Sequence, residues 1–293
     1  MKTRVITAIV ALAVFVGVLL APPIVFTIAL AAVTVIMLFE CYKATNADKA
    51  MKIVGLVSAV LLLIPIYFIT DNRYSRILIS NYYMLLCVLT ALIILMYMGL
   101  VVFKHGKRSY KDILSNGFLT FYIVGAMWCL QFIRAYIGTD FMIIVFIIAW
   151  SCDTVAYFSG RFFGKHKLIP HVSPNKTVEG AIGGVIGAMI CCTVYLIIAK
   201  NLTYLSPVYG VAEMNITSII AVGLSLGMIG GVFSQLGDLV ASSIKRDTGI
   251  KDFGWIFPGH GGFMDRFDSV MYIAPIVLIY LIFFCEIYVK MVG

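Results

Sequence analysis

The chain has 293 residues, of which 62% are hydrophobic and only 12% carry a charged side chain. A soluble domain of this length has about twice that charged fraction, so the composition excludes a soluble globular enzyme. The formal net charge of +8 has a simple cause in a membrane protein, because cytoplasmic loops are enriched in Lys and Arg and are attracted to anionic lipids. No nucleic-acid-binding motif accompanies this charge, so we expect no nucleic acid partner.

Long apolar runs occupy most of the sequence, and runs of roughly 18 or more residues are typical of transmembrane helices. Pro22 and Pro23 separate the first two runs, because proline breaks a helix and extends the residue before it. We therefore predict an all-α, polytopic integral membrane protein with about nine transmembrane helices. The predicted spans are about 5–21, 24–40, 53–70, 80–103, 117–137, 141–158, 180–199, 216–241 and 269–289.

The distribution of basic residues predicts the orientation of these spans. If the N-terminus is cytoplasmic, 17 of the 22 Lys and Arg fall on the cytoplasmic side and 5 on the other. Such an excess is typical of the cytoplasmic loops of membrane proteins. The sequence therefore predicts a cytoplasmic N-terminus and places the segments 104–116, 159–178 and 242–268 in the cytoplasm.

Polar residues enter the spans mainly in the second half of the sequence. The first four or five spans carry almost none, whereas acids, amides and hydroxyls appear in the spans from Trp150 onward. We therefore expect residues 1–137 to form a membrane scaffold and residues 138–293 to carry the chemistry, within one membrane-embedded unit. The cytoplasmic loops 159–178 and 242–268 belong to the second part.

The sixth predicted span ends with two polar residues, Asp153 and Tyr157, which share a helix face because they lie four residues apart. A carboxylate within a span costs roughly 2.5–3.5 kcal/mol on insertion scales, so it usually has a functional or a paired role. A functional role is the favoured interpretation here, and a packing contact with a neighbouring helix is the alternative.

A short polar segment, Ser173 to Gly180, precedes the seventh span. Thr177 stands where a helix N-cap is expected, and Gly180 takes the place of the acid in a full capping box. Alternatively, Lys176 and the free N–H groups of the helix start would bind a phosphate. The residues alone leave both interpretations open.

Three carboxylates flank the loop between the last two spans. Asp238 lies inside the cytoplasmic end of the eighth span, where Gln235 and Ser242 can orient it. Asp265 and Asp268 begin the ninth span on one helix face. Asp238 can therefore meet Asp265 across the hairpin of helices. A few carboxylates beside basic residues are how proteins hold Mg²⁺ on a nucleotide.

The loop itself contains the run Pro-Gly-His-Gly-Gly. Gly259, Gly261 and Gly262 would let backbone N–H groups approach phosphate oxygens, because no Cβ stands in the way. His260 could act as a base, but a hydrogen-bonding role is favoured.

The residues of this loop follow a long fixed pattern. Ser243 and Arg246 are followed by Lys251-Asp-Xaa-Gly and then by Pro-Gly-His-Gly-Gly-Xaa-Xaa-Asp-Arg-Xaa-Asp, which ends at Asp268. Both the fixed positions and the two spacers resemble the signature of the phosphatidate cytidylyltransferase family, also called CDP-diacylglycerol synthases. The segments around Asp153 and Lys176 are similar to that family as well.

The resemblance implies that CTP and phosphatidate react to give CDP-diacylglycerol and pyrophosphate. It implies Mg²⁺ as a cofactor, with Asp238 and Asp265 as ligands and Asp268 nearby, and it leaves room for a second cation. The residues that it assigns to catalysis are Asp238, Asp265, Asp268, Lys245, Arg246, Lys251 and Arg266. The residues that it assigns to substrate binding are Ser173, Pro174, Lys176, Thr177, Gly259, His260, Gly261, Gly262, Asp153 and Tyr157.

The partners implied by the resemblance are CTP, phosphatidate, membrane lipids and a second copy of the chain in a homodimer. The implied location is the bacterial inner membrane, with the active site facing the cytoplasm. A transporter or flippase of an anionic phosphate compound is the alternative, because polar residues in broken spans fit that class as well. Consumption of CTP with release of pyrophosphate would distinguish the enzyme from the transporter.

Overall fold

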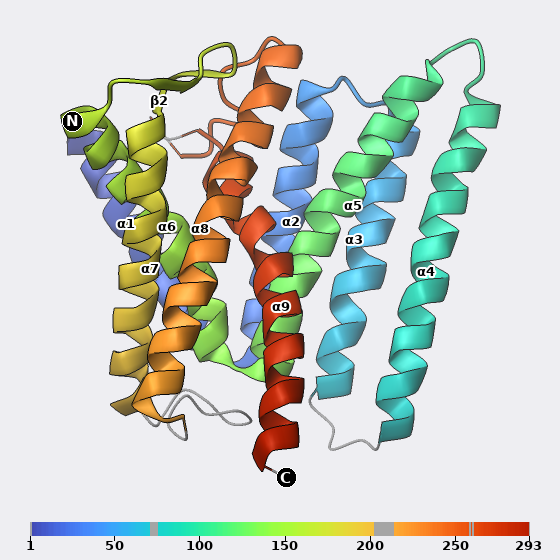
Figure 1. Ribbon diagram of the computed structural model, residues 1–293. Helices are drawn as coiled ribbons and strands as arrows, with labels where there is room; N and C mark the ends of the chain where they lie inside the picture. Colours follow the sequence, from blue (N-terminus) through green and yellow to red (C-terminus); the bar gives the residue numbers. More distant parts are fainter. Residues whose placement is uncertain (1, 71–75, 202–213, 258, 260, 293) are drawn as a thin grey trace. The chain divides into compact units, whose positions relative to one another are not determined.

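The computed structural model describes residues 2–70, 76–201, 214–257, 259 and 261–292, and most of them are helical (Figure 1). This confirms the all-α fold class. Within these ranges, seven helices, α2 and α4 to α9, are long and apolar enough to cross a membrane, so the count of nine spans and the cytoplasmic N-terminus stay predictions. The elements are α1 (Lys2–Leu20), α2 (Pro23–Ala44), α3 (Lys49–Thr70), α4 (Arg76–Phe103), α5 (Tyr110–Phe132), the π-helix η1 (Ile133–Ile137), α6 (Thr139–Phe163), β1 (Lys167–Ile169), β2 (Ser173–Thr177), α7 (Val178–Asn201), α8 (Ile216–Asp247) and α9 (Met264–Val292).

The turn between α1 and α2 lies where the two prolines predict it. Helix α1 ends at Leu20, and α2 begins at Pro23 with Pro22 as its N-cap residue. Proline suits the first helical position because the N–H that it lacks would have no intrahelical partner there. The local sequence therefore sets this boundary.

The chain divides into two compact units. Unit 1 consists of Met1–Gln131 and Thr248–Arg266, and unit 2 consists of Phe132–Asp247 and Phe267–Gly293. Unit 1 therefore combines helices α1 to α5 with the loop that follows α8, although this loop is distant from them in the sequence. The division of the chain into a scaffold and a catalytic part stays a prediction.

Unit 1 has an apolar core with a polar triad inside it. Met37 and Leu38 of α2 are fully buried. The hydroxyl oxygen of Tyr42 lies 2.6 Å from Oγ1 of Thr120, and the hydroxyl oxygen of Tyr97 lies 2.7 Å from the same atom. These hydrogen bonds join α2, α4 and α5. They also give the buried hydroxyl groups partners, and a buried hydroxyl without a partner would destabilise the unit.

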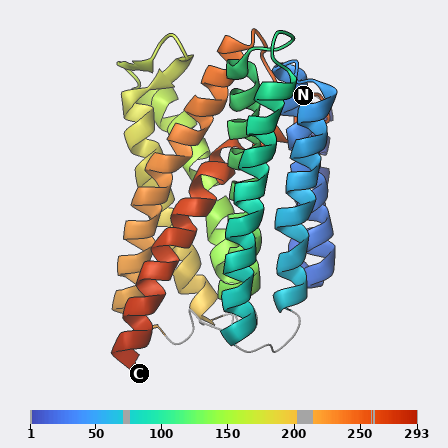
Figure 2. The same ribbon diagram turned by 90° about the vertical axis from the view of Figure 1, so that its right-hand side faces the viewer.

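Helices α6, α7 and α8 pack side by side in unit 2, as two views show (Figure 1 and Figure 2). A Cβ atom at Gly227 of α8 would lie 2.5 Å from Cα of Met189 in α7. A Cβ atom at Gly184 of α7 would lie 2.9 Å from the carbonyl oxygen of Cys152 in α6. Neither position has room for a side chain, so the glycines allow the helix backbones to approach closely.

Strands β1 and β2 form a short antiparallel hairpin next to the start of α7 (Figure 2). Lys167 pairs with Thr177, and Ile169 pairs with Ser173. The sequence predicts only a cytoplasmic turn at this place. Strands of three and five residues are too short for an alternating pattern of polar and apolar residues to reveal them.

Candidate functional site

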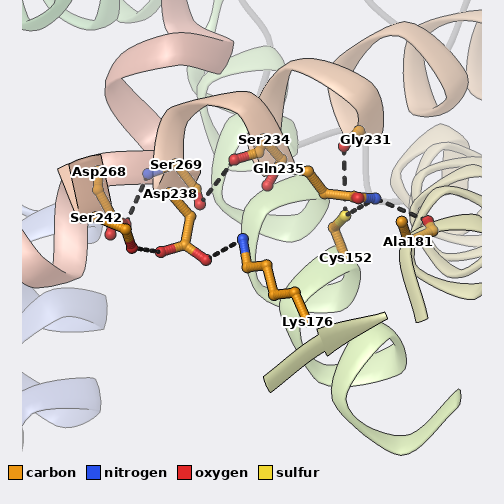
Figure 3. A network of polar contacts seen from close by, with 10 residues as sticks. All are labelled: Cys152, Lys176, Ala181, Gly231, Ser234, Gln235, Asp238, Ser242, Asp268 and Ser269. Carbon is orange, nitrogen blue, oxygen red and sulfur yellow. Dashed lines mark hydrogen bonds and ion pairs between the residues drawn. The ribbon is translucent and has the colours of Figure 1, made fainter. Parts of the chain in front are cut away.

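An ion pair joins the hairpin to α8 in unit 2 (Figure 3). Nζ of Lys176 in β2 contacts Oδ2 of Asp238, and these two side chains are 26% and 28% exposed. The hydroxyl of Ser242 lies 3.5 Å from Oδ1 of Asp238, which agrees with its predicted role in orienting this carboxylate. Gln235, for which the same role is predicted, instead donates its amide N–H to the carbonyl oxygen of Ala181 in α7 at 2.8 Å.

The carboxylate of Asp268 lies near this ion pair (Figure 3). Asp268 is 8% exposed, and its Oδ1 accepts a hydrogen bond from the N–H of Ser269 at 2.7 Å. The hydroxyl of Ser269 donates to the carbonyl oxygen of Ser234 at 3.1 Å, and a Cβ at Gly237 would lie 2.6 Å from the carbonyl oxygen of Asp268. Small residues therefore let α9 approach α8 closely, which brings Asp268 toward Asp238.

Charged side chains of both signs surround Asp268. Asp153 of α6, and Asp238 and Lys245 of α8, lie within electrostatic range of its carboxylate. Carboxylates that lie this close repel one another unless cations compensate them. Lys176 compensates Asp238 directly, and Lys245 adds a second positive charge. This cluster of charged side chains therefore contains carboxylates that can bind a cation and ammonium groups that can bind an anion.

Two side chains fasten the hairpin that carries Lys176. Oγ1 of Thr177 accepts a hydrogen bond from the N–H of Gly180 at 3.1 Å, so Thr177 is the N-cap of α7, which is one of the two interpretations that the sequence leaves open. Glu179 accepts the backbone N–H of His166 at 3.2 Å, and its other oxygen lies 2.6 Å from Nδ1 of the same residue. The base of the hairpin is therefore tied to the first turn of α7.

Ser173 and Pro174, which are predicted to bind substrate, lie in β2. Ser173 is half-buried and Pro174 is exposed. The ammonium group of Lys167 donates to the carbonyl oxygen of Pro174 at 2.7 Å. Nε of Arg246, at the end of α8, lies 3.5 Å from the carbonyl oxygen of Val172 just before β2. Arg246 therefore reaches the segment that carries the predicted phosphate-binding residues.

Asp153 and Tyr157 are both exposed near the end of α6. The hydroxyl of Tyr157 accepts a long hydrogen bond, 3.3 Å, from the guanidinium group of Arg161. In unit 1, Lys251 and Arg266 are exposed as well, so these two cations are accessible to an anionic ligand.

The glycine-rich loop of unit 1 is organised around the carboxylate of Asp265. Its Oδ2 accepts the N–H of Phe253 at 2.8 Å and the N–H of Gly262 at 3.0 Å. Gly259 and Gly261 have φ angles of 78° and 84°, a left-handed conformation that other residues rarely adopt. The loop therefore requires glycine at these two positions because of its backbone conformation.

His260 lies outside the described residues, so its hydrogen-bonding role stays a prediction. The N–H of Gly262 is predicted to approach a phosphate, and in the structure it is bonded to Asp265.

Comparison with known proteins shows the family. The profile described as the cytidylyltransferase family matches residues 2–284. The chain belongs to the cytidylyltransferase family. A phosphatidate cytidylyltransferase of Staphylococcus epidermidis is 35% identical over 295 aligned residues, which cover 96% of this chain and 99% of the relative. Phosphatidate cytidylyltransferases of Staphylococcus aureus and Staphylococcus haemolyticus are 36% and 34% identical, with the same coverage.

Mg²⁺ is compatible with the acids of this cytidylyltransferase. Among the residues that the structure describes, no three His, Cys, Asp or Glu side chains are arranged to hold a metal ion. Mg²⁺ does not need such a group, since one or two carboxylates suffice when water and substrate phosphates complete its octahedron. Asp238 and Asp268 in unit 2 meet this requirement. Asp265 belongs to unit 1, so the pairing of Asp238 with Asp265 stays a prediction.

Two carboxylates, those of Glu179 and Glu40, bind backbone N–H groups near the predicted site residues but are not among them. Glu179 belongs to a segment that the sequence singles out, but its contacts with His166 depend on the hairpin, which the sequence does not predict. Glu40 of α2 accepts hydrogen bonds from Phe263 and Met264 at the start of α9. A signal for Glu40 exists in the sequence, because an acid in an apolar span has a functional or a paired role by default.

We predict that Asp265→Ala and Asp265→Asn affect the loop differently. Alanine removes the acceptor of two buried N–H groups, and each unsatisfied group costs about 1–3 kcal/mol. Asparagine keeps an oxygen acceptor and removes only the charge. Hydrogen exchange of the Phe253 and Gly262 amides should therefore rise about tenfold or more in the alanine variant and much less in the asparagine variant. Equal exchange in both variants would show that Asp265 does not hold the loop through these bonds.

Proposed function

We propose that the chain transfers the cytidylyl group of CTP to phosphatidate and so forms CDP-diacylglycerol and pyrophosphate. A phosphate oxygen of phosphatidate forms a bond to the α-phosphorus of CTP. The bond from that phosphorus to the oxygen bridging the α- and β-phosphates breaks, and its electron pair leaves with pyrophosphate. The observation that carries the proposal is the similarity, over 96% of the chain, to proteins named phosphatidate cytidylyltransferase.

The charged group in unit 2 supports this reaction. The reaction brings together two polyanions, so their repulsion must be neutralised and their geometry fixed. Lys176 and Lys245 supply positive charge beside Asp238 and Asp268. The lipid phosphate is already largely ionised at neutral pH, because the second pKa of a phosphate monoester is about 6. A strong protein base is therefore unnecessary.

The acids of the site would hold the cofactor. When bound, Mg²⁺ would withdraw charge from the triphosphate and make the α-phosphorus more electrophilic. Asp238 would be one ligand, with Asp265 as the second ligand implied by the family resemblance and Asp268 nearby. Ser242 orients Asp238, and Lys176 balances its charge. The side chains proposed to bind the triphosphate and the lipid phosphate are Lys245, Arg246, Lys251 and Arg266.

We infer that phosphatidate enters from the bilayer and CTP from the cytoplasm. The seven long apolar helices found among the described residues and the bacterial relatives support a location in the bacterial inner membrane. The excess of basic residues in the predicted cytoplasmic segments supports an active site on the cytoplasmic face. The homodimer is inferred from the family resemblance alone.

Detergent-purified protein should consume CTP and release pyrophosphate when phosphatidate and Mg²⁺ are present. Asp238→Asn should lower kcat/KM about hundredfold or more, because the amide loses the charge that binds Mg²⁺. Ser225→Ala is the matched control, since Ser225 lies in the same helix but bonds to Tyr280. Near-wild-type activity of Asp238→Asn at limiting Mg²⁺ would reject the metal assignment. Movement of a phosphate compound across vesicles without CTP consumption would instead indicate a transporter.

Lys176 and Lys251 should differ in the substrate that they help to bind. We assign CTP mainly to the loop that contains Lys251, and the lipid phosphate or the departing pyrophosphate to Lys176. Each charge-assisted contact contributes about 1.5–3 kcal/mol, or roughly tenfold to hundredfold in binding. Steady-state kinetics should show that Lys176→Ala raises the apparent KM for phosphatidate more, and that Lys251→Ala raises the KM for CTP more. If both variants weaken only CTP, the assignment of two separate phosphate sites is wrong.

The orientation of the chain can be tested by labelling single cysteines in a cysteine-free variant. Ile250→Cys should react with an impermeant maleimide only after the inner face of the membrane is exposed, because segment 242–268 is predicted to be cytoplasmic. Ser206→Cys, between the seventh and eighth predicted spans, should react from the outer face of intact cells. Labelling of position 250 from the outer face would overturn both the span count and the cytoplasmic CTP site.

A further inference from the structure

The buried carboxylate of Glu40 in α2 binds the start of α9 within unit 1. Glu40 is only 7% exposed. Its Oε1 accepts the N–H of Phe263 at 3.1 Å, and its Oε2 accepts the N–H of Met264 at 2.8 Å. The first N–H groups of a helix have no intrahelical partner, and a negative charge near them is favourable. The two carboxylate oxygens of Glu40 therefore each accept a hydrogen bond from a backbone N–H group at the start of α9.

Helix α9 differs in this respect from other helices of the chain. Asp48, Thr177 and Asn215 each precede a helix and accept an N–H of its first turn, so α3, α7 and α8 are capped locally. The residue that precedes α9 is Phe263, whose side chain has no hydrogen-bond acceptor. Glu40, 223 residues earlier in the sequence, supplies the acceptor instead.

The loop before α9 is shaped around the Glu40 carboxylate. A Cβ atom at Gly254 would lie 2.1 Å from Oε1 of Glu40, and a Cβ atom at Gly262 would lie 2.3 Å from the same oxygen. Each distance is far below van der Waals contact, so neither position accepts a side chain while Glu40 is in place. Two glycines of the signature loop thus leave room for a carboxylate of this chain.

Glu40 contrasts with other buried polar residues of unit 1. Thr34 and Ser58 are fully buried, and each hydroxyl donates to the carbonyl oxygen four residues earlier in its own helix. These two residues satisfy their polar groups locally. A carboxylate is far more costly to bury than a hydroxyl, and Glu40 uses both oxygens on the loop. Its partners point to a role at the loop.

We propose that Glu40 is a positioning residue for the proposed cytidylyl transfer. Together with Asp265, it accepts hydrogen bonds from four backbone N–H groups between Phe253 and Met264. Asp265 binds the N–H groups of Phe253 and Gly262, and Glu40 binds the next two N–H groups after Gly262. Glu40 thereby fixes the first turn of α9, from which Asp265 projects. The role in catalysis rests on the proposed function, whereas the role in loop geometry does not.

Hydrogen exchange and kinetics of Glu40 variants test this inference. In Glu40→Ala, exchange of the Phe253, Gly262, Phe263 and Met264 amides should rise about tenfold or more, while exchange in the hairpin, 167–177, stays unchanged. The kcat at saturating CTP and phosphatidate should fall tenfold or more. Glu40→Gln keeps one acceptor oxygen and should lie between the wild type and Glu40→Ala in both measurements. Thr34→Val, in the same helix, is the matched control and should change neither.

The outcomes separate this proposal from the proposed function. Unchanged exchange of 262–264 in both Glu40 variants would overturn the positioning role, whatever the activity. An equal rise in exchange across α3 and α5 would also overturn it, because Glu40 would then only stabilise the unit. A localised rise with wild-type kcat would show that the loop position does not matter for turnover. If wild-type protein does not consume CTP but the localised rise occurs, the proposed function fails and the loop contact stands.

Discussion

Inside a membrane, the backbone N–H and C=O groups of a helix must find partners within the protein, because lipid offers none. The helix itself satisfies all of them except those at its ends. In this chain, side-chain oxygens satisfy the N–H groups at the starts of α3, α7, α8 and α9. The polar residues at these four helix starts therefore have a structural role. The same residues, or their neighbours in the sequence, are the ones that chemistry on phosphates would use.

Charge balance is the second constraint on the site. Two carboxylates of unit 2, those of Asp153 and Asp238, lie within electrostatic range of the Asp268 carboxylate. The ammonium group of Lys176 reaches Asp238 because Thr177 and Glu179 fix the hairpin at the start of α7. A basic residue is thus held beside the acids by local hydrogen bonds. Such preorganised charge is what a transfer between two anions requires.

The sequence predicts much of this architecture because local patterns control it. The apolar runs predict the helices, the two prolines predict the first turn, and a helix cap at Thr177 is one of the two interpretations that its segment allows. The signature loop predicts the family that the whole-chain match shows. Local patterns do not predict contacts between distant segments. The pairing of Lys176 with Asp238 depends on the hairpin, and the contact of Glu40 with α9 depends on how α2 packs.

Sequence spacing alone does not predict the partners of the acids at the start of α9. Asp265 and Asp268 lie three residues apart, so the sequence predicts that they share one helix face. In the structure, Asp265 accepts hydrogen bonds from its own loop, whereas Asp268 lies near Asp238 and Lys245. Neighbours on one helix thus have different partners, because the loop folds back onto only one of them.

The remote cap of α9 has a consequence for biosynthesis. Glu40 is translated more than two hundred residues before Phe263 and Met264, so its carboxylate enters the membrane long before its partners exist. Until α9 arrives, this charge in an apolar helix has to be hydrated or protonated. The glycine-rich loop is therefore completed in the same late step in which the Glu40 carboxylate gains its hydrogen-bond donors. A chain that is cut short before α9 therefore keeps an acid in α2 without the two N–H partners that Phe263 and Met264 supply.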